Sequence, residues 1–562
     1  MSTNKKKLLL FLFTSIVLTI KVFSQSLPDS IIKRIDNLYT NWNTSASPGC
    51  AVGIIRNDSL IFSKGYGIAN LEYELPITAE TIFYMASVSK QFTGYSVVLL
   101  TRQGKLKLDE DIHVYLPWAP DFGKLITVRH LLNHTSGIRD DIDLSAISGL
   151  GYEGMLTQDL ALNIIKRQRS LNFPPGEQYS YSNSNFVLLA EIVKAVSGKS
   201  FRTFADSAIF KPLRMSDTHF QDNYTEPIKN RATSYKRVDS NHYANEFQNV
   251  YTLGDGGLFT NVKDMAKWTN NFYNPTAGDL NDIAQLTQTG KLNNGKALTY
   301  ALGIGVDNYK GWKYFSHSGG LAGYRTFIKV FPDLKMGFLV FSNLGDFNSS
   351  AKANAMADIF ISDTTAKKKE VQKVQRDSLA AILKDISQLR KYTGNYIGED
   401  GIPLSVTIKN NRLYYHINDQ SNFLIRDSKD TFSVPDAPQR QFVFSIKAKD
   451  TTVDLVTPNR VYHVTKYIMD TLQPDEGLQT YTGTYYCPEL DCNYGIILKD
   501  HHLFLTNSKY NDTRITVANN KHLLTDYWWI RHLNMLRDSK QNIIGFEINA
   551  GSIMHLRFNK MK

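Results

Sequence analysis

One short stretch constrains this chain more than any other: a serine and a lysine, three residues apart, at the start of a helix-forming run. Ser87 and Lys90 follow the bulky residues 81–85 and precede the amphipathic run 92–100, which stops at Gly104, a residue suited to a helix C-cap. Side chains three apart on one helix share a face, with Cβ atoms about 5–6 Å apart. The stretch therefore predicts a helix that brings the Lys90 amine to the Ser87 hydroxyl.

This pairing predicts a covalent nucleophile at Ser87. A serine hydroxyl needs a neighbouring base, and a lysine amine can serve when burial or a second cation lowers its pKa toward neutrality. Backbone N–H groups at a helix start would also stabilise charge on an attacked carbonyl oxygen. The same spacing begins at Ser2, Ser30 and Ser349, so the setting of the Ser87 copy matters more than the spacing itself.

The N-terminus has the pattern of a secretory signal peptide over residues 1–24. Three lysines precede the apolar run 8–20, and a cleavage site follows at Ser24. The apolar core is short for a membrane span, and no later stretch is long and apolar enough to cross a bilayer. We expect an exported protein, periplasmic or extracellular, with no transmembrane span after signal removal; an uncleaved anchor is the alternative.

Composition and charge narrow the classes of protein. With 42% hydrophobic and 21% charged residues in a length of 562, the chain is globular and long enough for three or four domains. The formal charge of +11 falls to +7 once the four lysines at positions 5, 6, 7 and 21 leave with the signal. No basic cluster is interleaved with aromatic residues, so no nucleic-acid partner is expected. The mild positive charge leaves association with an anionic cell envelope open.

Short β-branched runs separated by turn residues predict two sets of strands. The first set is a hairpin over residues 51–63, with its turn at Asn57 and Asp58. The second set comprises the runs 302–306, 312–317, 324–331 and 336–343.

Two histidines raise the question of a metal site. His130 and His134 lie four residues apart on a predicted helix, a spacing found in some zinc sites. No glutamate follows His130 as a general base, and no third ligand is evident in the sequence. We expect both histidines to hydrogen-bond to the backbone near the helix end, and we predict neither a metal nor a cofactor.

Two further polar motifs lie at the ends of predicted elements. Tyr181 and Asn183 stand on a turn before a helix; they would relay a proton and hold a substrate amide, or merely cap that helix. His317 precedes Gly319 at a strand end, where a glycine lets a substrate backbone add itself to the sheet. The glycine-rich run 254–257 lacks the phosphate-loop pattern and predicts a tight loop beside a cleft.

The C-terminal third contains an internal repeat. Residues 392–396 recur almost unchanged as 481–485, an offset of 89 residues, and residues 408–410 and 413 have similar counterparts 90 residues later. This regularity predicts two copies of one β-rich unit, each long enough for a small antiparallel barrel. A charged, helix-prone linker over residues 367–390 precedes them.

The three cysteines lie in different settings. Cys487 and Cys492 are close enough to bridge across a loop in an oxidising compartment. Cys50 lies in a predicted strand and is expected to be a small buried residue.

Three motifs now stand in chain order: Ser87-x-x-Lys90, Tyr181-x-Asn183 and His317-x-Gly319. Over residues 30–355 this order resembles the penicillin-recognising serine hydrolases, which include class C β-lactamases, D-alanyl-D-alanine carboxypeptidases, D-aminopeptidases and related esterases. The runs 104–109, 131–137 and 317–320 extend the likeness.

The resemblance implies an α/β fold for residues 25–366. An antiparallel sheet made by both ends of this region would be flanked by helices, and a helical subdomain would hold Ser87. The resemblance also implies two lipocalin-like domains, each a small antiparallel β-barrel, over residues 391–474 and 475–562.

The same resemblance implies roles for the candidate residues. Ser87 would be acylated, while Lys90 and Tyr181 would manage its proton; either of these two is the base. Asn183 would hold the substrate amide. The backbone N–H groups of Ser87 and Gly320 would form the oxyanion hole.

One departure from the pattern concerns substrate choice. The β-lactamases of this group usually carry lysine where this chain has His317, and a neutral histidine would weaken carboxylate recognition. We therefore expect an exported serine hydrolase acting through an acyl-enzyme at Ser87 on small peptide-like amides, esters or β-lactams, with aminopeptidase or esterase substrates favoured. The alternative is a non-catalytic binding protein of this fold whose barrels recognise an envelope glycan or peptide.

Overall fold

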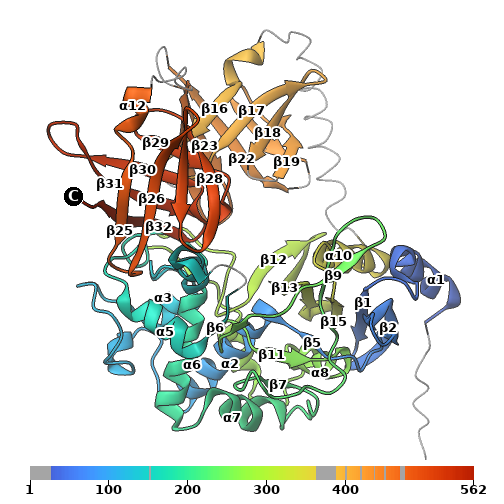
Figure 1. Cartoon of the computed structure of the whole chain (residues 1–562). Helices are drawn as coiled ribbons and strands as arrows, with labels where there is room; N and C mark the ends of the chain where they lie inside the picture. The colour runs from blue at the N-terminus through green and yellow to red at the C-terminus, as the bar shows by residue number, and fades with distance from the viewer. Residues whose placement is uncertain are drawn as a thin grey trace, which may run out of the picture.

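The computed structural model describes residues 27–150, 154–362, 388–398, 401–417, 420–435, 437–447, 451–468 and 475–562. The predicted signal peptide and residues 367–387 of the predicted linker helix lie outside these residues. Figure 1 shows a mixed α/β part, coloured blue to yellow-green, below two β-rich parts coloured orange and red.

A six-stranded antiparallel sheet, in the order β12-β13-β14-β15-β1-β2, forms the centre of the α/β part. Its strands are β1 (Cys50–Arg56), β2 (Ser59–Tyr66), β12 (Gly305–Tyr309), β13 (Trp312–Leu321), β14 (Tyr324–Phe331) and β15 (Met336–Ser342). Two strands come from the start of this part and four from its end, and β1 pairs with β15 along its whole length. The expectation that both ends build one antiparallel sheet is therefore confirmed.

Helices cover both faces of the sheet because successive side chains of each strand point to opposite faces. On one face, Val52 and Ile54 of β1 join an apolar cluster with α1 (Asp29–Leu38) and α10 (Ser349–Phe360). On the other face, Ala51 and Ile55 belong to the main core. That core also takes in α2 (Lys90–Arg102), α6 (Asn183–Ser197) and α8 (Val262–Asn271).

Smaller elements complete the α/β part. Its remaining α-helices are α3 (Val128–Leu132), α4 (Asp141–Ser145), α5 (Gln158–Arg167), α7 (Phe201–Ala205) and α9 (Leu280–Leu286). Its short strands are β3 (Ile68–Asn70), β4 (Leu75–Pro76), β5 (Phe83–Tyr84), β6 (Leu156–Thr157), β7 (His219–Phe220), β8 (Tyr235–Arg237), β9 (Tyr243–Asn245), β10 (Val250–Tyr251) and β11 (Leu258–Thr260).

Most of the predicted strands lie close to where the sequence placed them, with one displacement. The hairpin turn has positive φ at both Asn57 and Asp58, as its residue types indicate, and β14 has the predicted bounds. The strand predicted over 302–306 is wrong by three residues, because β12 begins at Gly305. The apolar residues before it form a buried turn in which the Leu302 carbonyl lies against Gly94 of α2.

The two histidines of the sequence analysis do not share a helix, so that part of the prediction is wrong. Helix α3 ends at Leu132, and Asn133 caps it. His134 lies beyond the end, with a φ of 56° that turns the chain away from the helix axis.

The two C-terminal β units differ in closure. Residues 388–468 contain a nine-stranded sheet: β16 (Gly394–Ile397), β17 (Leu404–Lys409), β18 (Arg412–Ile417), β19 (Gln420–Phe423), β20 (Ile425–Arg426), β21 (Thr431–Val434), β22 (Ala437–Ile446), β23 (Thr451–Val456) and β24 (Val461–Tyr467). Its two edge strands, β19 and β20, are separated in sequence only by Leu424, so the ends of the sheet meet.

Helix α12 (Asp475–Gln479) leads into the second unit, which is a closed barrel. Its strands are β25 (Gly483–Cys487), β26 (Cys492–Lys499), β27 (His502–Asn507), β28 (Tyr510–Val517), β29 (His522–Thr525), β30 (His532–Arg537), β31 (Ile543–Ala550) and β32 (Ile553–Lys560). A nearly closed sheet followed by a closed barrel confirms the predicted pair of β-barrel-like units.

The sequence repeat has a structural counterpart in both units. The Tyr396 hydroxyl donates to the Tyr392 carbonyl at 2.7 Å, and the Tyr485 hydroxyl donates to the Tyr481 carbonyl at 2.6 Å. The glycine within each motif has nearly the same backbone conformation, with φ of 141° and 143°. The repeated residues therefore build the same local turn twice.

Two further sequence expectations concern cysteines and membrane spans. Cys487 and Cys492 lie opposite each other in the β25–β26 pair, but both are free thiols, and burial raises the pKa of Cys487 to about 11. Cys50 is buried, as expected. Within the described residues, no helix combines the length and apolar character needed to cross a bilayer.

Candidate active site

Ser87 and Lys90 come together at the start of α2. Ser87 lies in the 3-10 turn Ala86–Ser89, and Lys90 is the first residue of the helix that follows. The Lys90 Nζ atom donates a hydrogen bond to Ser87 Oγ at 3.2 Å. Ala86 holds a φ of 47°, unusual for a residue with a side chain, and such strain is often found at functional sites. The predicted proximity of the amine and the hydroxyl is confirmed.

Lys90 is fully buried and held by three acceptors. Besides Ser87 Oγ, its Nζ donates to Asn183 Oδ1 at 2.7 Å and to the Asp255 carbonyl at 2.9 Å. Burial lowers the pKa of Lys90 to about 8, although the nearby carboxylates of Asp255, Asp140 and Asp141 act in the opposite direction. A lysine with this pKa has a neutral fraction near physiological pH.

Tyr181 completes the cluster of side chains. Its hydroxyl is hydrogen-bonded to Ser87, and Lys90 Nζ lies 4.8 Å from the centre of its ring. Burial raises the pKa of Tyr181 well above that of a free phenol, so the resting hydroxyl is protonated. A hydroxyl, an amine and a phenol from separate parts of the sequence therefore face one another.

His134, which lies beside this cluster, and His130 both bond to the backbone, as expected. His134 Nδ1 accepts from the Ser182 N–H at 3.2 Å, and its ring centre lies 4.2 Å from that of Tyr181. His130 Nδ1 accepts from the Thr127 N–H at 3.2 Å and so helps to cap α3. His134 therefore supports Tyr181 by packing.

His317 is a buried, neutral side chain. Its Nε2 lies 2.9 Å from the Tyr300 hydroxyl and its Nδ1 lies 2.7 Å from the Ser318 carbonyl. A carbonyl only accepts, so we assign the proton to Nδ1 and an accepting role to Nε2. Burial, and then the charge of Lys90, lower the pKa of His317 to about 4. His317 itself therefore carries no positive charge at neutral pH.

Gly319 is needed because β13 approaches the turn before Ser87 very closely. A Cβ at this position would lie 2.1 Å from the Met85 carbonyl oxygen and 2.3 Å from Thr326 Oγ1. The pairing of β12 with β13 ends at Gly305 and Ser316. In the described part of the chain, residues 317–321 therefore pair only with β14, and the other edge of β13 is open beside Ser87.

Two groups that hold the cluster were not identified from the sequence. The run 254–257 is a tight loop, as predicted, with φ of 95° at Gly254, but its contribution is the Asp255 carbonyl bound to Lys90. Asp140 accepts from both nitrogens of Asn183, the backbone N–H at 2.5 Å and Nδ2 at 2.9 Å. Asp140 belongs to none of the recognised motifs, so only the fold could reveal it.

The described residues also line a sizeable cavity. It has a volume of about 810 Å³ and is lined by residues of the α/β part and of both β units, including Gln178, Asn459 and His555. Its lining includes neither Ser87 nor Lys90. Chemistry at Ser87 therefore takes place outside this cavity.

An antiparallel sheet under helical layers, with a partly exposed serine next to a buried lysine between sheet and helices, defines a serine hydrolase. The sequence profile of the Beta-lactamase family matches residues 34–362, more than half of the chain, and the chain belongs to this family.

Individual relatives agree with this assignment. A penicillin-binding protein of Bacillus subtilis is 27% identical over 396 residues, covering 66% of this chain and 84% of that protein. A D-aminopeptidase of Brucella ovis is 31% identical over 280 residues, covering 50% of this chain and 53% of its own length, so the chain matches about half of that protein. The octameric penicillin-binding protein homologue of Pyrococcus abyssi has a similar fold, with a TM-score of 0.52, 24% identity, and coverage of 78% of this chain and 98% of that one.

Proposed function

We propose that this chain is an exported serine hydrolase that forms an acyl-enzyme at Ser87 and acts on small peptide-like amides or esters. The observation that carries this proposal is the buried Lys90 amine, 3.2 Å from Ser87 Oγ, with its pKa lowered to about 8. Such an amine is a competent base at the pH outside a cell.

The hydrogen bonds of Lys90 favour this residue, rather than Tyr181, as the base. A neutral amine has two N–H groups and one lone pair. Asn183 Oδ1 and the Asp255 carbonyl can only accept, so they take the two N–H groups. The lone pair then faces Ser87 Oγ and can receive its proton as the hydroxyl attacks. Tyr181, with its raised pKa, is suited to pass a proton to the leaving group.

The substrate would be bound along the open edge of β13. Its backbone would pair with residues 317–321 as an added strand, and the Asn183 amide would contact the acyl side. The backbone N–H groups of Ser87 and Gly320 would receive the developing oxyanion. A neutral His317 offers no charge to a substrate carboxylate, which favours uncharged esters and aminoacyl amides over penicillins.

Covalent labelling of Ser87 tests this function. The full chain and a Ser87→Ala variant are incubated with a fluorophosphonate and with a fluorescent penicillin, and intact masses are recorded. We expect one label per wild-type chain with the fluorophosphonate and none in the variant. Absence of label from both probes would overturn the proposal in favour of a binding protein. A panel of nitrocefin, p-nitrophenyl esters and D- and L-aminoacyl anilides then ranks the substrates.

A second prediction concerns substrate charge and pH. The ratio of kcat/KM for a carboxylate-bearing ester to that for its neutral analogue should not rise as the pH falls from about 8 to 5.5, because the pKa of His317 is about 4. Because the titration of Lys90 affects both kcat/KM values equally, it cancels in their ratio. A rise centred near pH 6.5 would contradict the neutral state of His317.

A further inference from the structure

Arg139 is a fully buried arginine at the contact between the α/β part and the closed barrel. Its Nε donates to the Met554 carbonyl at 2.9 Å, and its Nη2 donates to the His555 carbonyl at 3.2 Å. Its Nη1 pairs with Glu489 Oε2 at 3.1 Å. On its own side of the contact, Arg139 donates to the Ser170 carbonyl at 2.5 Å and to Ser170 Oγ at 2.8 Å.

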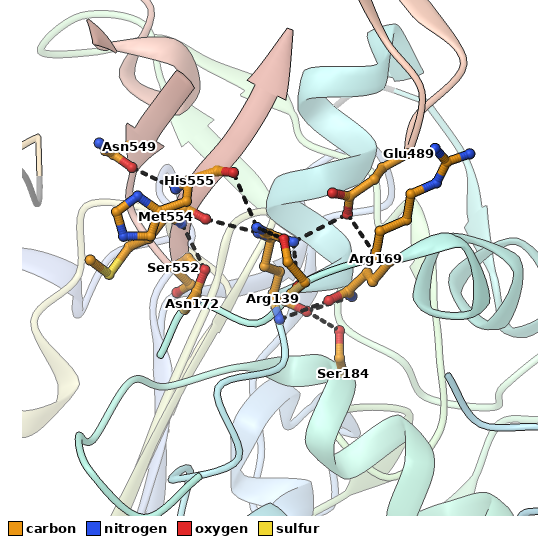
Figure 2. Close-up of polar contacts among 11 residues, drawn as sticks. Arg139, Arg169, Asn172, Ser184, Glu489, Asn549, Ser552, Met554 and His555 are labelled. Atoms are coloured by element: carbon orange, nitrogen blue, oxygen red, sulfur yellow. Dashed lines mark hydrogen bonds and ion pairs between the residues drawn. The ribbon is translucent and has the colours of Figure 1, made fainter. Parts of the chain in front are cut away.

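These contacts use the whole guanidinium. An arginine side chain carries five N–H groups, and five acceptors surround this one. Three of the acceptors belong to the barrel, as Figure 2 shows. Glu489 Oε2 also accepts from the Arg169 backbone N–H at 3.1 Å, which fixes the carboxylate. The geometry of Arg139 therefore depends on the barrel being docked.

Neighbouring residues extend the contact on both sides. Asn172 donates to the Ser552 carbonyl at 2.8 Å and accepts from the Met554 N–H at 2.7 Å. Leu144 of α4 and Ile147 just after it belong to the apolar cluster of the barrel. The segment that begins at Arg139 is thus held by the barrel along its length.

The next residue, Asp140, connects this segment to the catalytic cluster. Its Oδ1 accepts from the N–H groups of Ile142 and Asp143, and its Oδ2 accepts from both nitrogens of Asn183. Because the Asn183 nitrogen is held by Asp140, the Asn183 oxygen is turned toward Lys90, 2.7 Å away. Burial raises the pKa of Asp140, while the hydrogen bonds that it accepts and the charge of Lys90 act against this and favour the anion.

We propose that Arg139 is a positioning residue through which the docked barrel fixes Asp140, and thereby the Asn183 amide, against Lys90. The barrel is then part of the catalytic apparatus, although the described hydrogen bonds of Ser87 are to Lys90 and Tyr181. This inference rests on the proposed role of Lys90 as the base.

The groups that set the charge of Lys90 lie on several elements. They are Tyr181, His134, His317, Asp140, Asp141 and Asp255. Asp140 favours the ammonium form by its charge, and Asn183 Oδ1 favours it by accepting a hydrogen bond. If Asp140 is displaced, its charge moves away from Lys90 and Asn183 Oδ1 is no longer held in place as an acceptor. The pKa of Lys90 should therefore fall.

The test compares Arg139→Lys with Arg169→Lys in the full chain. Arg139→Lys keeps the positive charge but loses the planar guanidinium with its five N–H groups. Arg169→Lys is a matched control, because Arg169 is exposed and its described hydrogen bond to Glu489 comes from the backbone N–H. Unfolding midpoint, fluorophosphonate labelling of Ser87, and the pH profile of kcat/KM for a p-nitrophenyl ester are measured.

We expect Arg139→Lys to fold and to be labelled, with kcat/KM lowered by about ten- to a hundredfold. The apparent pKa of its profile should fall by about half a pH unit or more, while Arg169→Lys matches the wild type. A labelled Arg139→Lys protein with a wild-type profile would overturn the positioning role but leave the proposed function intact. Should Arg139→Lys fail to fold, Glu489→Gln decides in its place: a downward shift supports the proposal and a wild-type profile rejects it.

Discussion

Replacement of Lys90 by methionine is expected to slow the acylation of Ser87 by about a thousandfold or more. Methionine has a similar length, so the buried space stays filled while the base is lost. In the wild type, kcat/KM should rise with pH through about 8 and then level off, because the neutral amine is the active form and the pKa of Lys90 is about 8. In the variant this rise should be absent. Stopped-flow labelling across pH measures both effects.

The outcome also decides which residue is the base. Lys194 lies exposed on α6 and forms an ion pair with Glu191, so Lys194→Met serves as the control for loss of a lysine. If Lys90→Met were acylated at the wild-type rate while Tyr181→Phe was inactive, Tyr181 would be the base instead.

Gly319→Ala is expected to affect both stability and activity. The new methyl group would lie 2.1 Å from the Met85 carbonyl oxygen and 2.3 Å from Thr326 Oγ1, so β13 must move away from the turn that carries Ser87. Overpacking of this kind lowers the free energy of unfolding by about 1–3 kcal/mol. The displacement should also reduce Ser87 labelling at least about tenfold. Denaturant unfolding and labelling rates measure the two effects.

The adjacent glycine provides a matched control for stability. A Cβ at Gly320 meets nothing nearer than Arg325 Nη1, at 3.6 Å, which is ordinary contact. Gly320→Ala should therefore keep the wild-type unfolding free energy, or raise it slightly as the unfolded chain loses freedom. Equal stability losses in the two variants would show that the close approach at Met85 is not the cause.

Contacts between residues that are close together in the sequence are the features that the sequence predicts best. The Ser87–Lys90 contact depends on helix spacing alone, and the hairpin turn at Asn57 depends on residue types that accept positive φ. The repeat in the C-terminal third was also visible, because the same tyrosine hydrogen bond requires the same residues twice. In contrast, the convergence of Tyr181 on Ser87 followed only from resemblance to a family, since the two are far apart in sequence.

The groups that sequence reasoning missed act through the backbone or through a second residue. Asp255 binds Lys90 by its carbonyl, which every residue possesses, so its type carries no signal. Asp140 is linked to Lys90 by hydrogen bonds only through Asn183, and its charge acts on Lys90 from a distance, so no motif of neighbouring residues marks it. The misplaced strand at 302–306 has a related cause: apolar residues mark burial, and burial in a turn against α2 looks the same in sequence as burial in a strand.

The position of the Arg139 acceptors in the sequence has a consequence for biosynthesis. A ribosome releases Ser87 and Lys90 early, whereas the carbonyls of Met554 and His555 belong to β32, the last of the described strands. The nucleophile is therefore synthesised long before the strand whose carbonyls accept hydrogen bonds from Arg139. Two of the five acceptors of Arg139 therefore become available only after the chain has grown by at least 415 residues beyond it.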